Sequence, residues 1–374
     1  MAFLMVFCIL FSGCEKPLSD VPPVSKRRTV LVYLGTDNNF RREAFEKIET
    51  LKNNWSRHID GNLLIYADTG ESAVLVHIYH TARRGNVADT IEIYAPENSA
   101  SPATLARVLN RVEEYRPAAS RGLVVLSHGT GWLPAEMSQP SIGLKAVIQD
   151  RSESVDNYME LSDFANAIPN KLDFIIFDAC FMGSIEVCYE LKDIADYIVA
   201  SPAEVLAPGF VYATMMQHLF APVPNLREVA REFYEYFDNL SGNFRSATVS
   251  VVKTAELEAL AMTVQEILQS NPQTPEINNI QTFGYGAQRI YFDLGDYLQK
   301  LSPENQNNIQ TALKRCVVYE VHTPQYYSGG TRMLQPIHTF SGLTVYIPQA
   351  QYPLANDAYR MLRWTQRIHD SFLP

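Results

Sequence analysis

Short apolar runs alternate with stretches of helical periodicity from about residue 28 to about residue 215. Runs of this kind, rich in β-branched and aromatic residues and bounded by polar residues or glycine, predict buried strands. They lie at residues 28–34, 62–67, 73–79, 122–127, 172–177 and 197–200. Because predicted strands and helices alternate, the sequence predicts an α/β fold in which helices cover both faces of a mostly parallel sheet.

The clearest helix is predicted at residues 101–114. Ser101 is a residue type that caps helices, and Pro102 suits the first helical turn. Four apolar residues then share one face, namely Leu105, Val108, Leu109 and Val112. The pattern is that of a helix with one buried side.

After about residue 215 the pattern is less regular. Helices are expected near residues 226–239 and 255–268, and strands at 247–252 and 342–347. We therefore predict a first domain at residues 28–215 and a smaller C-terminal subdomain at residues 216–374 that packs on it.

Two reactive side chains lie at the ends of predicted strands. His128 follows the run at 122–127, and Cys180, 52 residues later, lies just past the run at 172–177. Ligands of α/β sheets collect at the carboxyl ends of the strands, so both side chains are expected at one edge. A thiol needs a neighbouring base to become a thiolate near neutral pH. The layout predicts Cys180 as a nucleophile and His128 as its general base and acid; a structural thiol and a structural histidine are the alternatives.

The sequence around these two residues resembles the clostripain family of caspase-like cysteine peptidases. The histidine stands in Ser-His-Gly-Thr-Gly-Trp at residues 127–132, and the cysteine in Phe-Asp-Ala-Cys-Phe-Met-Gly at residues 177–183. Three more stretches are similar to that family, at residues 31–39, 291–296 and 342–348. Caspases also carry their histidine about 50 residues before the cysteine. The resemblance implies a caspase-like three-layer sandwich, with residues 28–215 as its catalytic domain, and a cysteine endopeptidase that forms an acyl-enzyme through a Cys-His dyad.

Gly129 follows the histidine directly and is a candidate for stabilising charge on a substrate. A developing oxyanion needs backbone N–H donors that approach closely, and glycine leaves room for that approach. The N–H groups of Gly129 and Cys180 are therefore the predicted oxyanion hole. The alternative is that Gly129 and Gly131 only permit a tight turn.

The family resemblance implies cleavage after a basic residue, with carboxylates in the specificity pocket. Asp178 matches the acid two positions before the family's cysteine, and a carboxylate pairs well with a guanidinium. Glu204 is the acidic residue of the loop at 200–210. We predict Asp178 and Glu204 as substrate-binding residues. The alternative role for Asp178 is to cap the turn that follows it. The apolar residues Val205 and Leu206 favour a specificity pocket that is less selective for basic side chains.

A long segment separates the histidine from the cysteine. Members of the family that the sequence resembles are typically activated by cleavage in this interval, which makes Lys145 and Arg151 candidate cleavage sites. An ordinary surface loop is the alternative. Asp37, Asn38 and Asn39 follow the first predicted strand at the same edge, where they brace the site or cap the next helix.

The first residues resemble a bacterial lipoprotein signal. An apolar stretch at residues 2–11 is followed by a serine, a glycine and Cys14. The resemblance implies a signal peptide at residues 1–14, a lipid on Cys14 and a flexible tether at residues 15–27. We therefore expect a protein of the bacterial cell envelope, held on the periplasmic or outer surface by its lipid alone. A buried N-terminal strand or helix is the alternative.

The charge and composition of the chain limit the classes of partner that it is expected to bind. A formal net charge of −10 argues against a nucleic acid, because phosphate binding needs a basic face. No internal run reaches the roughly 18 apolar residues of a membrane span. The cysteines and histidines lack zinc spacing and no EF-hand pattern occurs, so we predict no metal site. Calcium is implied only by the family resemblance, and thiol chemistry requires no cofactor.

The partner expected from this chemistry is a peptide or protein substrate, bound by a monomer. A different class of function is a catalytically silent surface lipoprotein that binds peptide in the same cleft. A transpeptidase that uses the same thiol acyl transfer is a third possibility.

Overall fold

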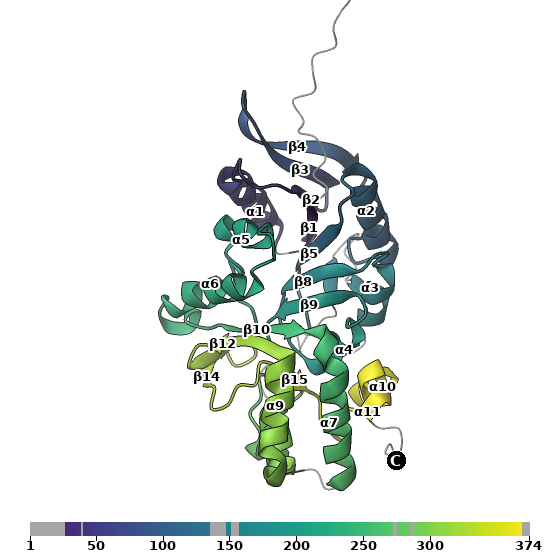
Figure 1. Ribbon diagram of the computed structural model, residues 1–374, viewed down its shortest axis with the longest axis vertical. Coiled ribbons are helices and arrows are strands. Elements are labelled where there is room, and N and C mark those ends of the chain that lie inside the picture. The colour runs from purple at the N-terminus through teal and green to yellow at the C-terminus, as the bar shows by residue number, and fades with distance from the viewer. Residues whose placement is uncertain are drawn as a thin grey trace, which may run out of the picture.

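In the computed structural model, nine strands of the described residues form a single sheet through the middle of the molecule (Figure 1). The structure describes residues 27–38, 40–134, 147–150, 157–271, 275–284 and 288–368. The strands are β1 (Arg28–Gly35), β2 (Asn62–Asp68), β3 (Ala73–Thr81), β4 (Gly85–Tyr94), β5 (Ser120–Leu126), β8 (Leu172–Asp178), β9 (Ala195–Ala200), β10 (Thr248–Lys253) and β12 (Val317–His322). They lie in the order β12-β10-β9-β8-β5-β1-β2-β3-β4. The central strands from β9 to β2 pair in parallel, and the outer strands pair antiparallel.

Helices cover both faces of this sheet, so the molecule has three layers (Figure 1). The helices are α1 (Arg41–Asn54), α2 (Pro102–Tyr115), α3 (Leu161–Ala167), α4 (Ile185–Glu190), α5 (Tyr212–Leu219), α6 (Leu226–Asp238), α7 (Leu257–Ser270), α8 (Leu294–Leu301), α9 (Gln306–Cys316), α10 (Pro353–Met361) and α11 (Arg363–Ile368). Val30 and Val32 of β1 share a buried cluster with α1, α5 and α6. Leu31 and Tyr33 belong to a second buried cluster, which they share with α2, α3 and α4. The two clusters lie on opposite faces of the sheet, because successive side chains of a strand point to opposite faces. The predicted α/β three-layer fold is confirmed.

Helix α2 matches the clearest helical pattern in the sequence. It buries Leu105, Val108 and Val112 on the face that the spacing predicts, and Pro102 is its first residue. Ser101 occupies the capping position, but its side chain makes no capping hydrogen bond, which corrects that part of the prediction.

The chain after α5 continues the same sheet through β10 and β12. The predicted domain boundary between residues 215 and 216 falls inside α5. Two short strands further on, β11 (Phe292–Asp293) and β15 (Thr344–Val345), pair with each other. The Thr344 N–H donates a hydrogen bond of 3.0 Å to the carbonyl oxygen of Gly183, so this late segment packs near the cysteine loop. The division into a catalytic domain and a C-terminal subdomain stays a prediction.

Two further pairs of short strands lie outside the central sheet. They are β6 (Ile148–Asp150) with β7 (Asn157–Met159), and β13 (Gln325–Ser328) with β14 (Met333–Pro336). The first pair lies in the chain between the histidine and the cysteine. The second forms a hairpin that approaches the loop after β9.

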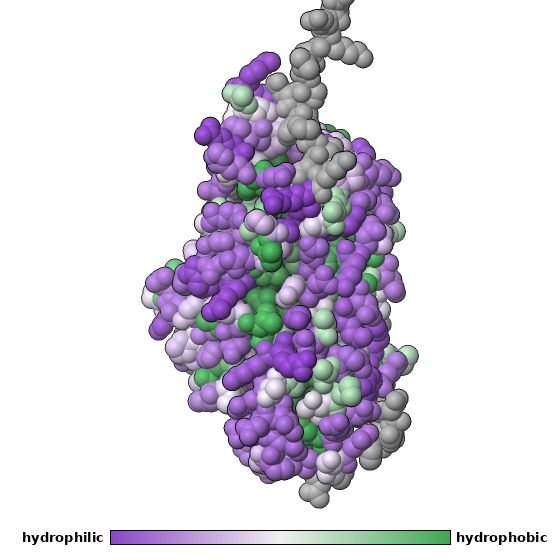
Figure 2. Space-filling model, viewed as in Figure 1, coloured by the Kyte–Doolittle hydropathy of each residue, from purple (hydrophilic) through white to green (hydrophobic). Residues whose placement is uncertain are grey.

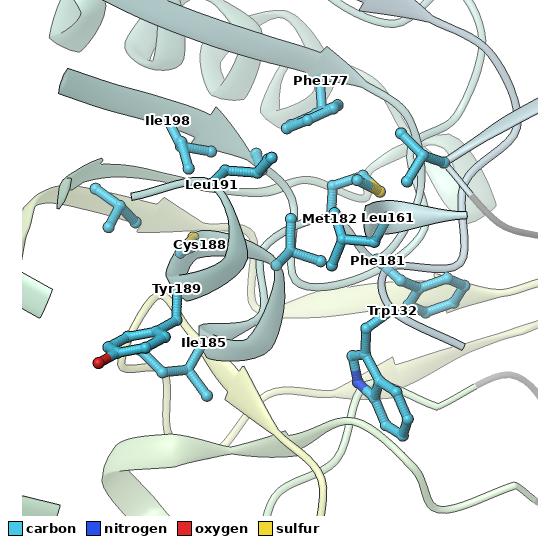
Figure 3. Packing of buried hydrophobic residues seen from close by; sticks show 14 of the residues in the cluster. Trp132, Leu161, Phe177, Phe181, Met182, Ile185, Cys188, Tyr189, Leu191 and Ile198 are labelled. Carbon is cyan, nitrogen blue, oxygen red and sulfur yellow. The ribbon is translucent and has the colours of Figure 1, made fainter. Parts of the chain in front are cut away.

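The apolar core continues directly behind the cysteine loop. Met182 and Ile185 belong to one buried cluster with Trp132 (Figure 3). Cys188 of α4 is a buried free thiol within this cluster, and it lies near Leu191 in the same view. The loop that carries Cys180 is therefore held from behind by close packing.

The opposite edge of the sheet has a different surface. Figure 2 shows hydrophobic residues gathered near the middle of one otherwise hydrophilic face, beside α5 and α6. A groove lined by Tyr197, Val223 and Val318 lies between the start of α6 and strands β9, β10 and β12. This groove lies at the edge of the sheet where β8 and β9 begin. Cys180 follows the end of β8 and therefore lies at the opposite edge.

Several predictions concern residues outside the described part of the chain. The predicted signal peptide at residues 1–14, which includes Cys14, lies outside the described residues. The predicted tether at 15–27 lies outside them too, except for residue 27. So do Asn39 and the two candidate cleavage sites, Lys145 and Arg151. Within the described ranges, no helix has the length and apolar character needed to cross a membrane.

Candidate active site

The ends of β5 and β8 bring the His128 and Cys180 segments into contact. These strands pair in parallel with Leu126 opposite Asp178, and the two reactive residues each follow two positions later. Gly129 packs directly against the cysteine loop, because a side-chain carbon on it would lie 2.7 Å from the carbonyl oxygen of Cys180. Glycine is therefore required here for close approach of the two backbones.

The His128 ring is half-buried and packs on Phe40. The ring centroids are 4.4 Å apart, with the planes inclined at 30°. Phe40 immediately precedes α1 and lines the same cleft as Cys180. This aromatic contact limits the positions that the imidazole can adopt beside the cleft.

The Cys180 thiol is covered by the loop that follows β9. The Val205 N–H lies 3.3 Å from Sγ, and Sγ lies 3.8 Å from the Val205 carbonyl oxygen. Burial, and then the nearby Glu204 carboxylate, raises the pKa of Cys180 to about 12. The thiol is therefore protonated at neutral pH in this conformation, and a nucleophilic thiolate requires a change in its surroundings.

The turn after Cys180 is held in an unusual conformation. Phe181 has a φ of 59°, in the left-handed region that bulky residues rarely adopt, and such a residue costs about 1–3 kcal/mol. Its N–H donates to the Ala203 carbonyl oxygen at 3.0 Å. Its ring stacks on Tyr291 with centroids 4.5 Å apart, and the Tyr291 hydroxyl donates to the Thr130 carbonyl oxygen at 2.8 Å. Tyr291 thus ties the histidine and cysteine loops together from the C-terminal part of the chain.

Asp178 is buried at the end of β8, with a lysine as its neighbour. Its Oδ1 accepts a hydrogen bond of 3.4 Å from the Phe210 N–H. Lys47 of α1 donates to the carbonyl oxygens of Pro208 and Phe210. Burial raises the pKa of Asp178, and the positive charge of Lys47 opposes that rise.

A cleft of about 350 Å³ of empty space, partly open to solvent, runs beside Cys180. It lies between the start of α1 and the loop at residues 205–209, and Val205 and Leu206 contribute apolar lining. Among the described residues, the acids that line it are Asp178 and Glu43. Sequence reasoning missed Glu43, because nothing in the spacing of charges on α1 marks it.

Glu204 belongs to the covering loop but is not one of the described residues that line the cleft. Its Oε1 accepts a hydrogen bond of 2.6 Å from the Gly329 N–H, in the turn between β13 and β14. Burial raises the pKa of Glu204 to about 7. Its carboxylate acts on the cysteine through its charge.

Asn38 joins the first strand to the segment before the cysteine. Its Nδ2 donates to the carbonyl oxygens of Gly35 at 3.2 Å and Gln149 at 3.0 Å, and its Oδ1 accepts from the Phe40 N–H at 2.9 Å. The residue therefore braces the strand end and fixes the turn that leads into α1. Asp37 is partly buried beside Gly70.

A model of the Clostripain family matches residues 32–366. The chain belongs to the clostripain family. His128, Cys180 and the cleft between α1 and the covering loop all fall inside the matched region. Sequence motifs and fold thus agree on a family of cysteine-type peptidases.

Relatives of this clostripain-family protein include clostripain from Hathewaya histolytica, which is 26% identical over 230 residues, covering 53% of this chain and 43% of that protein. The match therefore spans less than half the length of that relative. An inactive zymogen C11 protease from Parabacteroides distasonis has a TM-score of 0.81 and 32% identity, covering 93% of this chain and 99% of the other. A secreted C11 cysteine protease from Bacteroides thetaiotaomicron, in complex with an irreversible peptide inhibitor, has a TM-score of 0.81 and 27% identity, covering 92% and 99%.

Calcium remains the ion that the family resemblance implies. Within the described ranges, no group of three or more histidine, cysteine or acidic side chains is arranged to hold a metal ion. Calcium binding therefore stays a prediction, and we derive no step through it.

Proposed function

We propose that this clostripain-family protein is a cysteine endopeptidase that works through a Cys180–His128 dyad. The imidazole takes the thiol proton, and Sγ attacks the carbonyl carbon of the scissile peptide bond. The C–N bond then breaks, and the imidazolium gives its proton to the leaving amine. Water, activated by the same imidazole, hydrolyses the acyl-enzyme and restores the thiol. The contact of the Gly129 and Cys180 backbones at one sheet edge is the observation that carries this proposal.

The oxyanion of the tetrahedral intermediate is proposed to bind the N–H groups of Gly129 and Cys180. Fixed backbone donors stabilise such a charge without reorganising at the moment of reaction. The close packing of the two loops and the bond from Tyr291 to Thr130 support a rigid arrangement here.

We propose a preference for substrates that are cleaved after arginine or lysine. Asp178 lines the cleft beside the thiol, where a carboxylate attracts a cationic side chain. Glu204 adds a second negative charge in the same region, close enough to raise the pKa of Cys180. Val205 and Leu206 provide the apolar walls along which a long side chain packs.

The covered thiol supports a precursor that becomes active after an internal cut. Cleavage after Lys145 or Arg151 is proposed to release the segment between histidine and cysteine and to let the covering loop move away from Sγ. One structural relative is described as an inactive zymogen. We further propose that the protein acts as a monomer anchored to the bacterial cell envelope through a lipid on Cys14.

Turnover of a fluorogenic peptide library by purified residues 15–374 tests the peptidase directly. We expect cleavage by the wild-type chain that both Cys180→Ala and His128→Ala abolish. Circular dichroism should show the same secondary-structure content in both variants as in the wild-type chain. No turnover by the wild-type chain, even after limited proteolysis and with calcium present, would support the silent peptide-binding lipoprotein. Products extended by an added amine would indicate transpeptidation.

A further inference from the structure

Among the described residues, two carboxylates line the cleft beside Cys180 and one lysine borders it. The carboxylates are those of Asp178 and Glu43. Lys47 lies one helical turn beyond Glu43, on the same face of α1. Two carboxylates and one ammonium group leave a net charge of about −1 for a ligand to meet.

Lys47 lies near Asp178 and binds backbone groups around it. The two side chains are 7% and 5% exposed. The Lys47 ammonium binds the carbonyl oxygens of Pro208 and Phe210, and it lies 4.0 Å from the ring centroid of Tyr212. Burial lowers the pKa of Lys47, and among the neighbouring acids Asp178 does most to oppose that fall. A buried cation beside a buried carboxylate offsets much of the charge that the carboxylate presents to a ligand.

One of these acids retains a buried oxygen that lacks a donor. Within the described part of the chain, Glu43 Oε2 has no hydrogen-bond partner, whereas the Asp178 carboxylate lies beside the Tyr212 hydroxyl, which opposes the rise that burial causes in its pKa. A buried acceptor without a donor costs free energy, so the cleft favours a ligand that brings several N–H groups. The guanidinium of arginine has five such donors, and the ammonium of lysine has three.

We infer that Glu43 supplies the net negative charge that selects arginine or lysine before the scissile bond, while Lys47 serves as the counterion of Asp178. This inference rests on the proposed peptidase function and names a specificity-determining residue for it. Asp178 then contributes an oriented acceptor, and Glu43 contributes the charge. Among the described residues, the covering loop contributes no acid to the lining of this cleft. Glu43, which lies on α1 more than a hundred residues earlier in the chain, contributes one.

Paired peptides that differ only in arginine or citrulline before the scissile bond test the inference. Citrulline keeps the shape of arginine and removes its charge, so the ratio of the two kcat/KM values isolates the electrostatic preference. Glu43→Gln is expected to lower this ratio by about 10- to 100-fold. Lys47→Met is expected to raise it. The matched control is Glu46→Gln, because Glu46 lies on the same helix, is exposed and binds Arg42 at 2.8 Å. An unchanged ratio in Glu43→Gln, with turnover present, would overturn the inference and leave the peptidase proposal intact.

A binding measurement covers the case in which the wild-type chain turns over nothing. In the Cys180→Ala background, calorimetry compares the affinities of peptides that end in arginine or citrulline, with and without Glu43→Gln. Loss of the arginine advantage in the double variant supports the role of Glu43 even if the peptidase proposal fails. Equal advantages with and without Glu43→Gln, or no advantage in Cys180→Ala, would contradict it.

Discussion

The backbone N–H of Val205 lies 3.3 Å from the Sγ atom of Cys180. The preceding residue, Glu204, accepts a hydrogen bond of 2.6 Å from the Gly329 N–H, so one loop brings both a backbone group and a carboxylate to the nucleophile. The N–H lowers the pKa of the thiol, but burial and the Glu204 charge raise it more strongly, to about 12. The resting conformation thus keeps the thiol protonated.

Removing the charge of Glu204 is expected to make Cys180 more reactive. In Glu204→Gln the amide oxygen can still accept from Gly329, but the negative charge that disfavours the thiolate is gone. The pKa of Cys180 therefore falls, and the rate of alkylation by iodoacetamide at pH 7 to 9 rises severalfold. Peptide mapping by mass spectrometry separates Cys180 from the buried Cys188 and Cys316.

The control for this experiment is Glu114→Gln, which removes a carboxylate that is 71% exposed and lies on α2. It should leave the alkylation profile of Cys180 unchanged. Equal rates for Glu204→Gln and the wild-type chain across the pH range would show that Glu204 does not control the thiol.

The central strands were predictable because burial on both faces leaves a strong signal in sequence. Every residue of β1 and β2 is buried, and these strands appear as apolar runs. Strands β4 and β12 were not predicted. They lie at the two edges of the sheet, most of their residues are partly or fully exposed, and their charged positions blur the pattern.

The positions of His128 and Cys180 at strand ends could be inferred for the same reason, but their surroundings could not. Glu43 and Lys47 stand among other charges on an amphipathic helix, and nothing local separates them from Glu46. They meet Asp178 and Pro208 only through tertiary packing. The cover over the thiol is a backbone group, and a backbone contact leaves no mark on residue type.

Asp68 links the pH to the stability of the fold. Its side chain is fully buried at the end of β2, where Oδ1 accepts from the Gly70 N–H at 2.9 Å. Burial, with a further contribution from the neighbouring Asp150, raises the pKa of Asp68 to about 7. Between its ordinary pKa of 3.8 and about 7, the folded chain holds a proton that the unfolded chain has released.

The free energy of unfolding is therefore expected to fall as pH rises through this window, by up to about 1.4 kcal/mol per pH unit from Asp68 alone. Below pH 4 both states carry the proton and the effect vanishes. Asp68→Asn keeps an acceptor for Gly70 and cannot ionise, so its stability should fall less steeply between pH 5 and 7. Urea unfolding of both chains in the Cys180→Ala background measures the difference. Asp60→Asn, at an exposed site, is the control, and identical slopes for Asp68→Asn and its parent would refute the assignment.

Gly129→Ala tests whether contact between the two loops is needed for catalysis. The added carbon would lie 2.7 Å from the Cys180 carbonyl oxygen and 3.0 Å from the Ala179 side chain. The first neighbour is backbone and cannot rotate away, so the loops must separate. A shift of about 1 Å at reacting groups costs roughly 100-fold in rate, and overpacking costs about 1–3 kcal/mol of stability. We expect kcat/KM to fall by about two orders of magnitude in a chain that still unfolds cooperatively in urea. A variant with wild-type kcat/KM would show that the dyad does not depend on this contact.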